Sequence, residues 1–319
     1  MTQAKRSFVA VTGAGGFIGR ALCARLQEHG QPVRRLVRAS RGDEADEVAI
    51  DLERAQPEAL ARVLDGAMAV VHLAARVHRM EDSGADAEAA HRLVNVDVTE
   101  RLALAAVTAG VRRFVFASTV KVNGETTPRG RAFRAGDAPS PQDAYARSKL
   151  AAERTLAQVS SGTSMLATTL RLPLVYGAGA GGNFRRLVDA VAARRFLPFG
   201  AIDNRRSVLG LDNLLDAIEA VLASDNAVIG AHFVADAQSV STPALVRAIA
   251  DALGVEPRLL SVPVGALKLG GALAGRSATI ARLVGSLEVD ASALARATAW
   301  QPRPFRIDTA MVQRVPAYN

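Results

Sequence analysis

Short apolar segments alternate with helix-like stretches through the first half of the chain, and this alternation constrains the fold more than any other feature. The apolar segments are nearly continuous in hydrophobicity, which is typical of strands buried on both faces of a parallel sheet. They span residues 7–13, 32–38, 47–52, 68–75, 113–119 and 167–177, and the helical patterns between them span 18–29, 57–64, 87–109 and 144–160. The sequence therefore predicts an α/β fold with a doubly wound parallel sheet.

A glycine-rich turn joins the first predicted strand to the first predicted helix. Gly13, Gly16 and Gly19 have the spacing G-x-x-G-x-x-G. Glycines in this context let the backbone turn tightly and approach a pyrophosphate, while the N-terminus of the helix supplies N–H donors. We therefore expect a Rossmann-type sheet, with the three glycines, Phe17 and Ile18 binding a dinucleotide.

The chain changes character after Gly177. Residues 178–183 form a glycine-rich loop, amphipathic helices follow at 214–223 and 242–254, and one more strand is expected at 231–236. We expect residues 1–177 to form an NAD(P)-binding Rossmann domain, with a returning segment near 208–238. Residues 178–207 and 239–319 would then form a smaller C-terminal substrate-binding lobe.

The end of the second predicted strand lacks the acidic residue that usually holds the ribose of NAD. Val37 takes that place, and Arg38 and Arg41 follow it. These arginines would suit a 2′-phosphate, so the sequence favours NADP(H), with NAD(H) as the alternative. Alternatively, both are solvated surface arginines.

Tyr145 and Lys149 lie four residues apart, on one face of a predicted helix. The ammonium group is expected to lower the pKa of the phenol and make it an effective acid or base. Ser118 and Thr119 end a predicted strand at the carboxyl edge of the sheet, where α/β proteins bind ligands. Alternatively, Tyr145 and Lys149 are an ordinary i,i+4 pair on the surface of the helix, and Ser118 and Thr119 are ordinary turn residues at the end of a strand.

With these motifs, the chain resembles extended short-chain dehydrogenases/reductases over nearly all of its length, in particular the NAD-dependent epimerase/dehydratase group. The resemblance implies Thr119 as the catalytic hydroxyl, Tyr145 as the acid/base and Lys149 as its partner, with Ser118 and Asn95 as auxiliary residues. The resemblance further implies cofactor contacts from Asp51, Leu52, Leu73, Ala74, Ala75 and Pro173, and substrate contacts from Lys121, Asn183 and Arg206. His72 is expected to be a core residue without a chemical role.

The resemblance implies chemistry at C4 of a nucleotide-activated sugar. Lys121, Asn123 and the missing acidic residue depart from the pattern of galactose 4-epimerases. We therefore favour NADPH-dependent reduction of a UDP-4-keto-(6-deoxy)-HexNAc in surface polysaccharide synthesis. The alternatives are a UDP-hexose or UDP-HexNAc 4-epimerase with tightly bound NAD and, in another class, a non-catalytic dinucleotide-binding module. A homodimer through helices 87–109 and 144–160 is also implied.

Composition and patterning argue against other classes of protein. The formal charge of +8 comes mainly from scattered arginines, and the chain has no nucleic-acid-binding motif. Cys23 is the single cysteine, which excludes an internal disulfide and a multi-cysteine metal site. We expect no metal, no membrane insertion and a cytoplasmic location. Segment 262–285 is expected to be a lobe helix packed over the sugar site; the alternative is a helix at a membrane surface.

Overall fold

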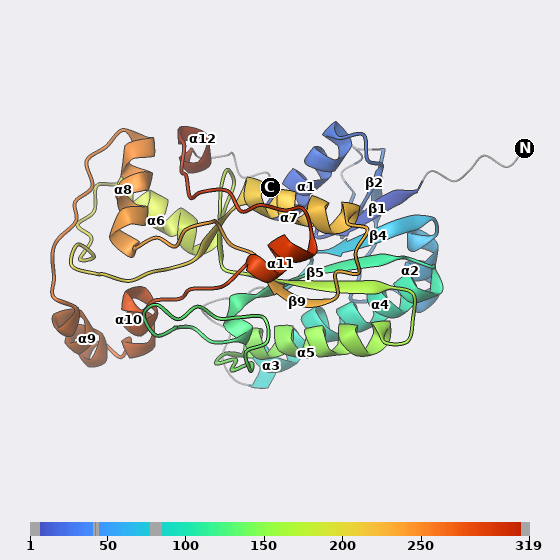
Figure 1. Ribbon diagram of the computed structural model, residues 1–319, viewed down its shortest axis with the longest axis horizontal. Coiled ribbons are helices and arrows are strands. Elements are labelled where there is room, and N and C mark those ends of the chain that lie inside the picture. The colour runs from blue at the N-terminus through green and yellow to red at the C-terminus, as the bar shows by residue number, and fades with distance from the viewer. Residues whose placement is uncertain (1–6, 41, 43–44, 77–84, 314–319) are drawn as a thin grey trace, which may run out of the picture.

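A seven-stranded parallel sheet forms the centre of the computed structural model (Figure 1), which describes residues 7–40, 42, 45–76 and 85–313. The strand order is β3-β2-β1-β4-β5-β6-β9. These strands are β1 (Phe8–Thr12), β2 (Val33–Val37), β3 (Glu47–Ala49), β4 (Ala67–His72), β5 (Arg113–Thr119), β6 (Leu166–Leu172) and β9 (Gly230–Phe233). The strand order reverses between β1 and β4, where doubly wound sheets bind ligands. The predicted fold class is confirmed.

Helices cover both faces of this sheet (Figure 1). One face carries α1 (Phe17–Glu28), α7 (Leu211–Ala223) and α11 (Ser292–Ala297), and the other carries α2 (Pro57–Leu64), α4 (Val98–Thr108) and α5 (Ala144–Ser160). Side chains of β1 alternate between the two faces: Val9 and Val11 join the core under α1, and Phe8 and Ala10 join the core under α2 and α4. Cys23 is fully buried in the first of these cores.

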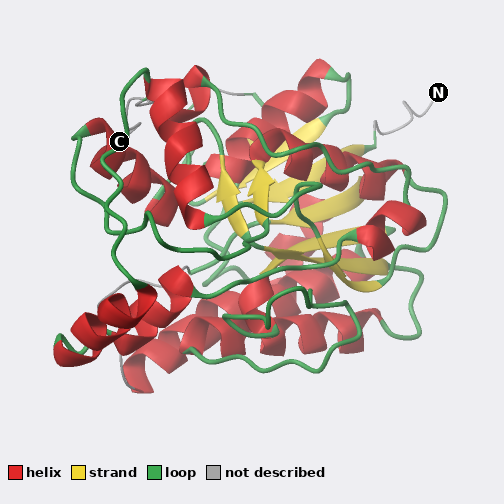
Figure 2. Cartoon of the chain, turned by 60° about the vertical axis from the view of Figure 1, so that its left-hand side comes forward, coloured by secondary structure: helices red, strands yellow, loops and turns green. Residues whose placement is uncertain are grey.

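A smaller group of elements lies beside the carboxyl edge of the sheet (Figure 2). It contains a two-stranded sheet of β7 (Leu174–Tyr176) and β8 (Val208–Gly210). The helices are α6 (Gly182–Ala192), α8 (Thr242–Leu253), α9 (Val264–Leu273), α10 (Ser277–Val284) and α12 (Thr309–Val312). Phe184 and Val188 of α6 pack with Val246 and Ile249 of α8 in a separate apolar core.

Three predicted elements are interrupted in the structure. The single strand predicted at 167–177 is wrong, because Pro173 has no N–H to continue the ladder and the chain leaves the main sheet there to form β7. The helix predicted at 87–109 is divided into α3 (Ala85–Arg92), the π-helical segment η1 (Leu93–Asp97) and α4. The helix predicted at 262–285 is a hairpin of α9 and α10, with Gly275 at a φ of 65° between them.

Candidate active site

Helix α5 presents the predicted acid/base pair. Asp143 caps the helix, since its Oδ1 accepts a hydrogen bond from the N–H of Ala146 at 2.7 Å. Tyr145 and Lys149 follow one helical turn apart. Lys149 is buried, and its Nζ donates to the carbonyl oxygen of Ala117 at 2.7 Å and lies 4.4 Å from the ring centre of Phe116. The helix thus sets Lys149 against β5, one turn after Tyr145.

The pKa of Tyr145 differs from the expected one. Burial, together with the charge of Asp143, raises the pKa of Tyr145 to about 12. Burial lowers the pKa of Lys149 to about 7, against the opposing charge of Glu153. The prediction that Lys149 lowers the pKa of Tyr145 is therefore wrong for this structure, because desolvation of the phenolate dominates. The phenol keeps its proton at neutral pH and can act as a proton donor.

The two hydroxyls at the end of β5 differ in their surroundings. The Ser118 hydroxyl donates to Oε1 of Glu153, which is a buried carboxylate on α5. The Thr119 hydroxyl instead accepts from the backbone N–H of Lys121 at 3.3 Å. Because neighbouring strand residues point to opposite faces, only Ser118 is held by α5 in this way.

A buried ion pair supports this edge of the sheet, and the sequence analysis did not identify it. Arg171 on β6 donates from Nη2 to Oε2 of Glu153 at 2.6 Å and from Nη1 to Oδ1 of Asn123 at 2.9 Å. Two features of the sequence could have indicated this pair. Arg171 is a charged residue inside an apolar strand, and Glu153 places a carboxylate four residues after Lys149, on the same helical face. The pair joins α5, β6 and the segment after β5.

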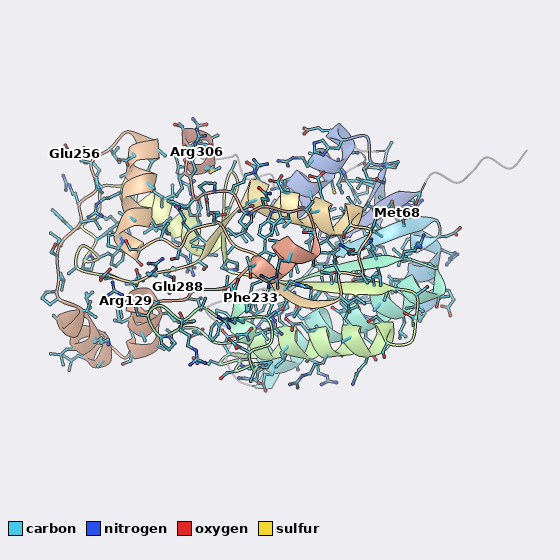
Figure 3. All side chains as sticks on the ribbon, viewed as in Figure 1. Met68, Arg129, Phe233, Glu256, Glu288 and Arg306 are labelled. Carbon is cyan, nitrogen blue, oxygen red and sulfur yellow. The ribbon has the colours of Figure 1, made fainter. Side chains whose placement is uncertain are left out.

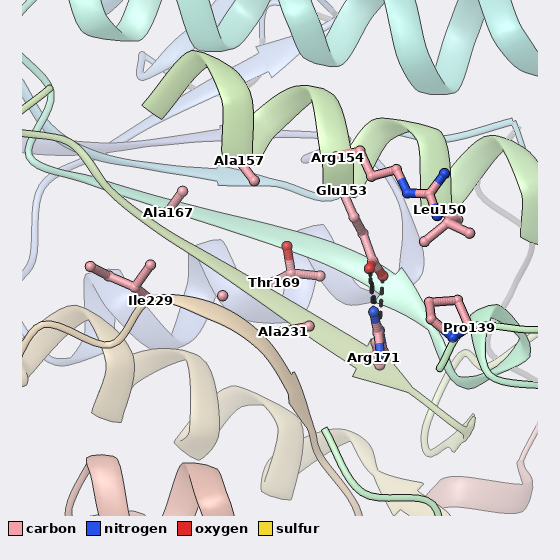
Figure 4. Close-up of a pocket in the computed structure, with 11 residues that line it drawn as sticks. Pro139, Leu150, Glu153, Arg154, Ala157, Ala167, Thr169, Arg171, Ile229 and Ala231 are labelled. Atoms are coloured by element: carbon pink, nitrogen blue, oxygen red, sulfur yellow. Dashed lines mark hydrogen bonds and ion pairs between the residues drawn. The ribbon is translucent and has the colours of Figure 1, made fainter. Parts of the chain in front are cut away.

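A groove of about 270 Å³ lies against this ion pair, between α5 and strands β6 and β9 (Figure 4). Figure 4 shows Glu153 and Arg171 meeting there, with Leu150 and Pro139 at one end of the groove. Tyr145 and Lys149 do not line it. The groove is therefore not part of the predicted acid/base site.

The glycine turn approaches the chain after β4 closely. Gly13 has a φ of 66°, and a Cβ on it would lie 2.8 Å from the backbone nitrogen of Ala74. A Cβ on Gly19 would lie 2.2 Å from the carbonyl oxygen of Gly13, so α1 can pack on the turn only with glycine there. The N-cap of α1 is Gly16, which has no side chain to cap the helix, and the first turn has no acidic residue. These features fit an anionic group such as a pyrophosphate.

A buried chain of hydrogen bonds leads from this turn towards Tyr145. The Thr12 hydroxyl accepts from the N–H of Ala74 and lies 2.6 Å from Nδ1 of His72. Nε2 of His72 lies 3.1 Å from the Thr99 hydroxyl, which donates to the carbonyl oxygen of Asn95. Each hydroxyl has one proton, so Thr12 donates to Nδ1 and His72 donates from Nε2. Burial lowers the pKa of His72 to about 3, and the neutral ring therefore serves as a core connector.

Asn95 completes this chain from the π-helical segment η1. Its Nδ2 donates to the Ser148 hydroxyl at 2.9 Å and to the carbonyl oxygen of Arg76, while its Oδ1 accepts from the N–H of Arg76. Ser148 in turn donates to the carbonyl oxygen of Tyr145 at 2.8 Å. The π-helical turn, a feature common at functional sites, places Asn95 between the cofactor edge and α5.

The remaining predicted cofactor residues surround the same edge of the sheet. Leu73, Ala74 and Ala75 follow β4, Pro173 follows β6, and Asp51 accepts from the N–H of Glu53 through Oδ1. Leu52 packs on the core beneath α2 and α4. Arg38 is exposed and pairs with Glu53 at 2.7 Å. Arg41 lies outside the described residues.

Two of the three predicted substrate residues, Lys121 and Arg206, lie near the carboxylate of Glu125. Nζ of Lys121 pairs with Asp143 at 2.6 Å and with Glu125 at 3.3 Å. Arg206 donates to the carbonyl oxygens of Arg282 and Gly285, at the C-terminal end of α10. Asn183 is exposed in the first turn of α6. Among the described ranges, no group of three or more His, Cys, Asp or Glu side chains could hold a metal ion.

The chain is similar to known proteins in sequence. The model of the "NAD dependent epimerase/dehydratase family" matches residues 9–235. A UDP-glucose 4-epimerase of Vibrio cholerae is 39% identical over 234 residues, which cover 73% of this chain and 71% of the relative. A dTDP-6-deoxy-L-talose 4-dehydrogenase (NAD(P)(+)) of Kitasatospora kifunensis is 30% identical, with coverage of 80% and 82%.

Solved structures share the fold over nearly the whole chain. MoeE5 in complex with UDP-glucuronic acid and NAD is 25% identical, with a TM-score of 0.75, and the match covers 94% of this chain and 95% of that one. The UDP-glucuronic acid 4-epimerase from Bacillus cereus in complex with NAD has a TM-score of 0.73 at 19% identity, with coverage of 92% and 93%. The second likeness concerns the fold alone.

Proposed function

The chain belongs to the NAD dependent epimerase/dehydratase family, and from that premise we propose that it is an NAD(P)-dependent enzyme acting at C4 of a UDP-activated sugar. Family membership confirms the resemblance seen in the sequence. The proposed reaction is reduction of a UDP-4-keto-(6-deoxy)-HexNAc for surface polysaccharide synthesis, and the location is the cytoplasm. The relatives that act on or bind UDP-sugars support this choice of substrate.

The placement of Lys149 against β5, one helical turn after Tyr145, carries the proposal. A nicotinamide cofactor, when bound, supplies the hydride for carbon. Tyr145, protonated at neutral pH, donates the proton to the carbonyl oxygen of the substrate, and the Thr119 hydroxyl orients that oxygen. Ser118 is the weaker candidate for this role, because its hydroxyl is already bonded to Glu153. Lys149 would hold the nicotinamide ribose.

The cofactor is proposed to be NADP(H), with NAD(H) as the alternative. Gly13 and Gly19 allow the tight packing of the turn, and the N-terminus of α1, which has no side-chain cap, would bind the pyrophosphate. Arg38 supports the choice of NADP(H), since it directly follows β2, which ends without an acidic residue. The phosphate would have to compete with Glu53 for this arginine.

The second candidate is a 4-epimerase with tightly bound NAD, and the sequence relative from Vibrio cholerae favours it. An epimerase must move hydride in both directions on one cofactor, whereas a reductase exchanges its cofactor. Val37 in place of the ribose-binding acid, followed by Arg38, supports the reductase, because a reductase can draw on NADPH. A non-catalytic dinucleotide-binding module would not need Tyr145 and Lys149 in this arrangement.

Incubation of the protein with NADPH and a UDP-4-keto-6-deoxy-HexNAc tests the proposal, with the sugar product identified by NMR. We expect oxidation of NADPH in step with reduction at C4, and a loss of about 10²–10⁴-fold in kcat for Tyr145→Phe because the proton donor is removed. NADPH binding by this variant, followed by fluorescence, verifies that the site is intact.

Inversion of a UDP-hexose without added cofactor would instead establish the epimerase. Unchanged turnover by Tyr145→Phe would refute the assigned proton donor. Ser118→Ala provides a comparison at the neighbouring hydroxyl, and we expect it to retain far more activity than Thr119→Ala.

A further inference from the structure

The hairpin of α9 and α10 presents an apolar face that no other part of the described structure covers. Gly271 of α9 packs against Ile280 of α10, where an added Cβ would lie 2.5 Å from Cγ1 of Ile280. The opposite side of α9 is exposed, with Leu269 at 64% and Leu273 at 83%. These two leucines lie four residues apart, so they share one helical face. Ala266 and Gly270 are also exposed on that face.

Exposed apolar residues also occur in the segment that precedes α9. Leu260 is 46% exposed, and its N–H donates to the carbonyl oxygen of Leu197 at 2.9 Å. Phe196, next to Leu197, is 63% exposed, and Arg258 lies 5.0 Å from its ring centre. Four of the seven exposed large hydrophobic residues of the described chain therefore belong to this end of the lobe (Phe196, Leu260, Leu269 and Leu273).

The charged residues of the hairpin itself are all basic. Residues 264–284, which span α9 and α10, contain Lys268, Arg276 and Arg282 and no acidic residue. Arg282 pairs with Glu125 at 3.3 Å, which fastens α10 to the segment after β5. Lys268 and Arg276 are exposed, and no carboxylate within the described ranges forms an ion pair with either. Glu256 lies at the upper left of the molecule, whereas α9 lies at the lower left (Figure 3).

An exposed apolar helix face flanked by unpaired basic side chains matches the surface of an anionic bilayer. A membrane span is not required for this: among the described residues, none of the helices combines the length and apolarity needed to cross a bilayer. We propose that the α9–α10 hairpin binds peripherally to membranes that contain anionic phospholipid. Leu269 and Leu273 enter the headgroup region, and Lys268 and Arg276 contact lipid phosphates.

Sedimentation of the full-length protein with sucrose-loaded vesicles tests this inference. We expect binding to vesicles of equal parts phosphatidylglycerol and phosphatidylcholine, weaker binding to phosphatidylcholine alone, and weaker binding as the salt concentration rises. Leu269→Glu with Leu273→Glu should lower the partition coefficient by tenfold or more, on the order expected for losing the burial of two leucines. Lys268→Glu with Arg276→Glu should abolish the preference for anionic lipid.

Ile229→Glu is the matched control, because Ile229 is 58% exposed and lies before β9, outside the hairpin. It should bind vesicles as the natural protein does. Failure of the natural protein to sediment with anionic vesicles at low salt, or equal sedimentation of the double leucine variant, would overturn the inference. A change in the mass of the leucine variant in light scattering would also overturn it, since the face would then join copies of the chain. Turnover in solution should not change in any of these variants, so this test is independent of the proposed reaction.

Discussion

At the scale of single residues, the chemistry of the site depends on the protonation state of each titratable side chain. Tyr145 keeps its proton because a buried phenolate is costly, and His72 stays neutral for the corresponding reason. Lys149, with a pKa of about 7, is the one of these three groups that titrates near neutrality. Glu153 supports the ammonium form of Lys149, and it also holds Ser118 and Arg171.

Removal of the Glu153 charge is expected to destabilise the fold. Glu153→Gln leaves Arg171 buried without its carboxylate, and breaking such a pair costs about 3–5 kcal/mol. Urea denaturation measures the loss in the free energy of unfolding. Since Glu153 raises the pKa of Lys149, the same change should move the titration of Lys149 to lower pH.

Glu88→Gln is the control for this experiment, because Glu88 also pairs with a residue of α5, Arg147, but in a half-exposed position. That change should cost no more than about 1 kcal/mol. Equal losses for the two variants would show that the buried pair has no special importance for stability.

At the scale of elements, two interruptions build the site. The π-helical segment η1 separates α3 from α4 and sets Asn95 against Ser148. Pro173 ends β6, so that β7 can leave the main sheet and pair with β8 beside it. In each case a helix or strand is interrupted near the carboxyl edge of the sheet, where the candidate active site lies.

The packing of α1 on the glycine turn gives a prediction at this scale. In Gly19→Ala the new methyl group would meet the carbonyl oxygen of Gly13, so α1 must shift. We expect a loss of about 1–3 kcal/mol in the free energy of unfolding, together with weaker NADPH binding. Denaturation and a fluorescence titration measure the two effects.

Gly136→Ala is the matched substitution, since no atom lies within 4 Å of its added Cβ and its φ is not positive. It should change the free energy of unfolding by no more than about 0.5 kcal/mol. If Gly19→Ala behaved in the same way, the close approach of α1 to the turn would not matter.

At the scale of the whole molecule, the homodimer stays a prediction, and the layer of helices that contains α4 and α5 offers a surface for it. Leu93 and Leu104, on η1 and α4, are 45% and 51% exposed. This is the layer from which the family resemblance implies a homodimer. A contact across a two-fold axis would bury both leucines in each of the two chains.

We therefore expect Leu104→Glu to convert a dimer into a monomer, because the change places a charge in each half of an apolar contact. Light scattering of the natural protein and the variant measures the mass. Ile229→Glu, which alters an exposed apolar residue elsewhere, should leave the mass unchanged. A natural protein with the mass of one chain would contradict the proposed dimer.

Local periodicity determined much of this protein from the sequence alone. The bounds of α2 and α5 were predicted correctly, because amphipathic spacing and a polar cap are properties of neighbouring residues. The placement of Tyr145 and Lys149 on one helical face follows from the same geometry. The glycine turn could also be predicted, because only a residue without Cβ tolerates such close backbone contact.

Tertiary structure decided everything that depends on partners distant in sequence. It joined Glu153 to Arg171, bonded Ser118 but not Thr119 to α5, and engaged Lys121 in ion pairs. It also raised the pKa of Tyr145 where the neighbouring lysine alone predicted a decrease, since the cost of desolvation depends on the whole environment of a group. Sequence spacing fixes which side chains share an element, but burial and charge pairing arise only when the elements pack together.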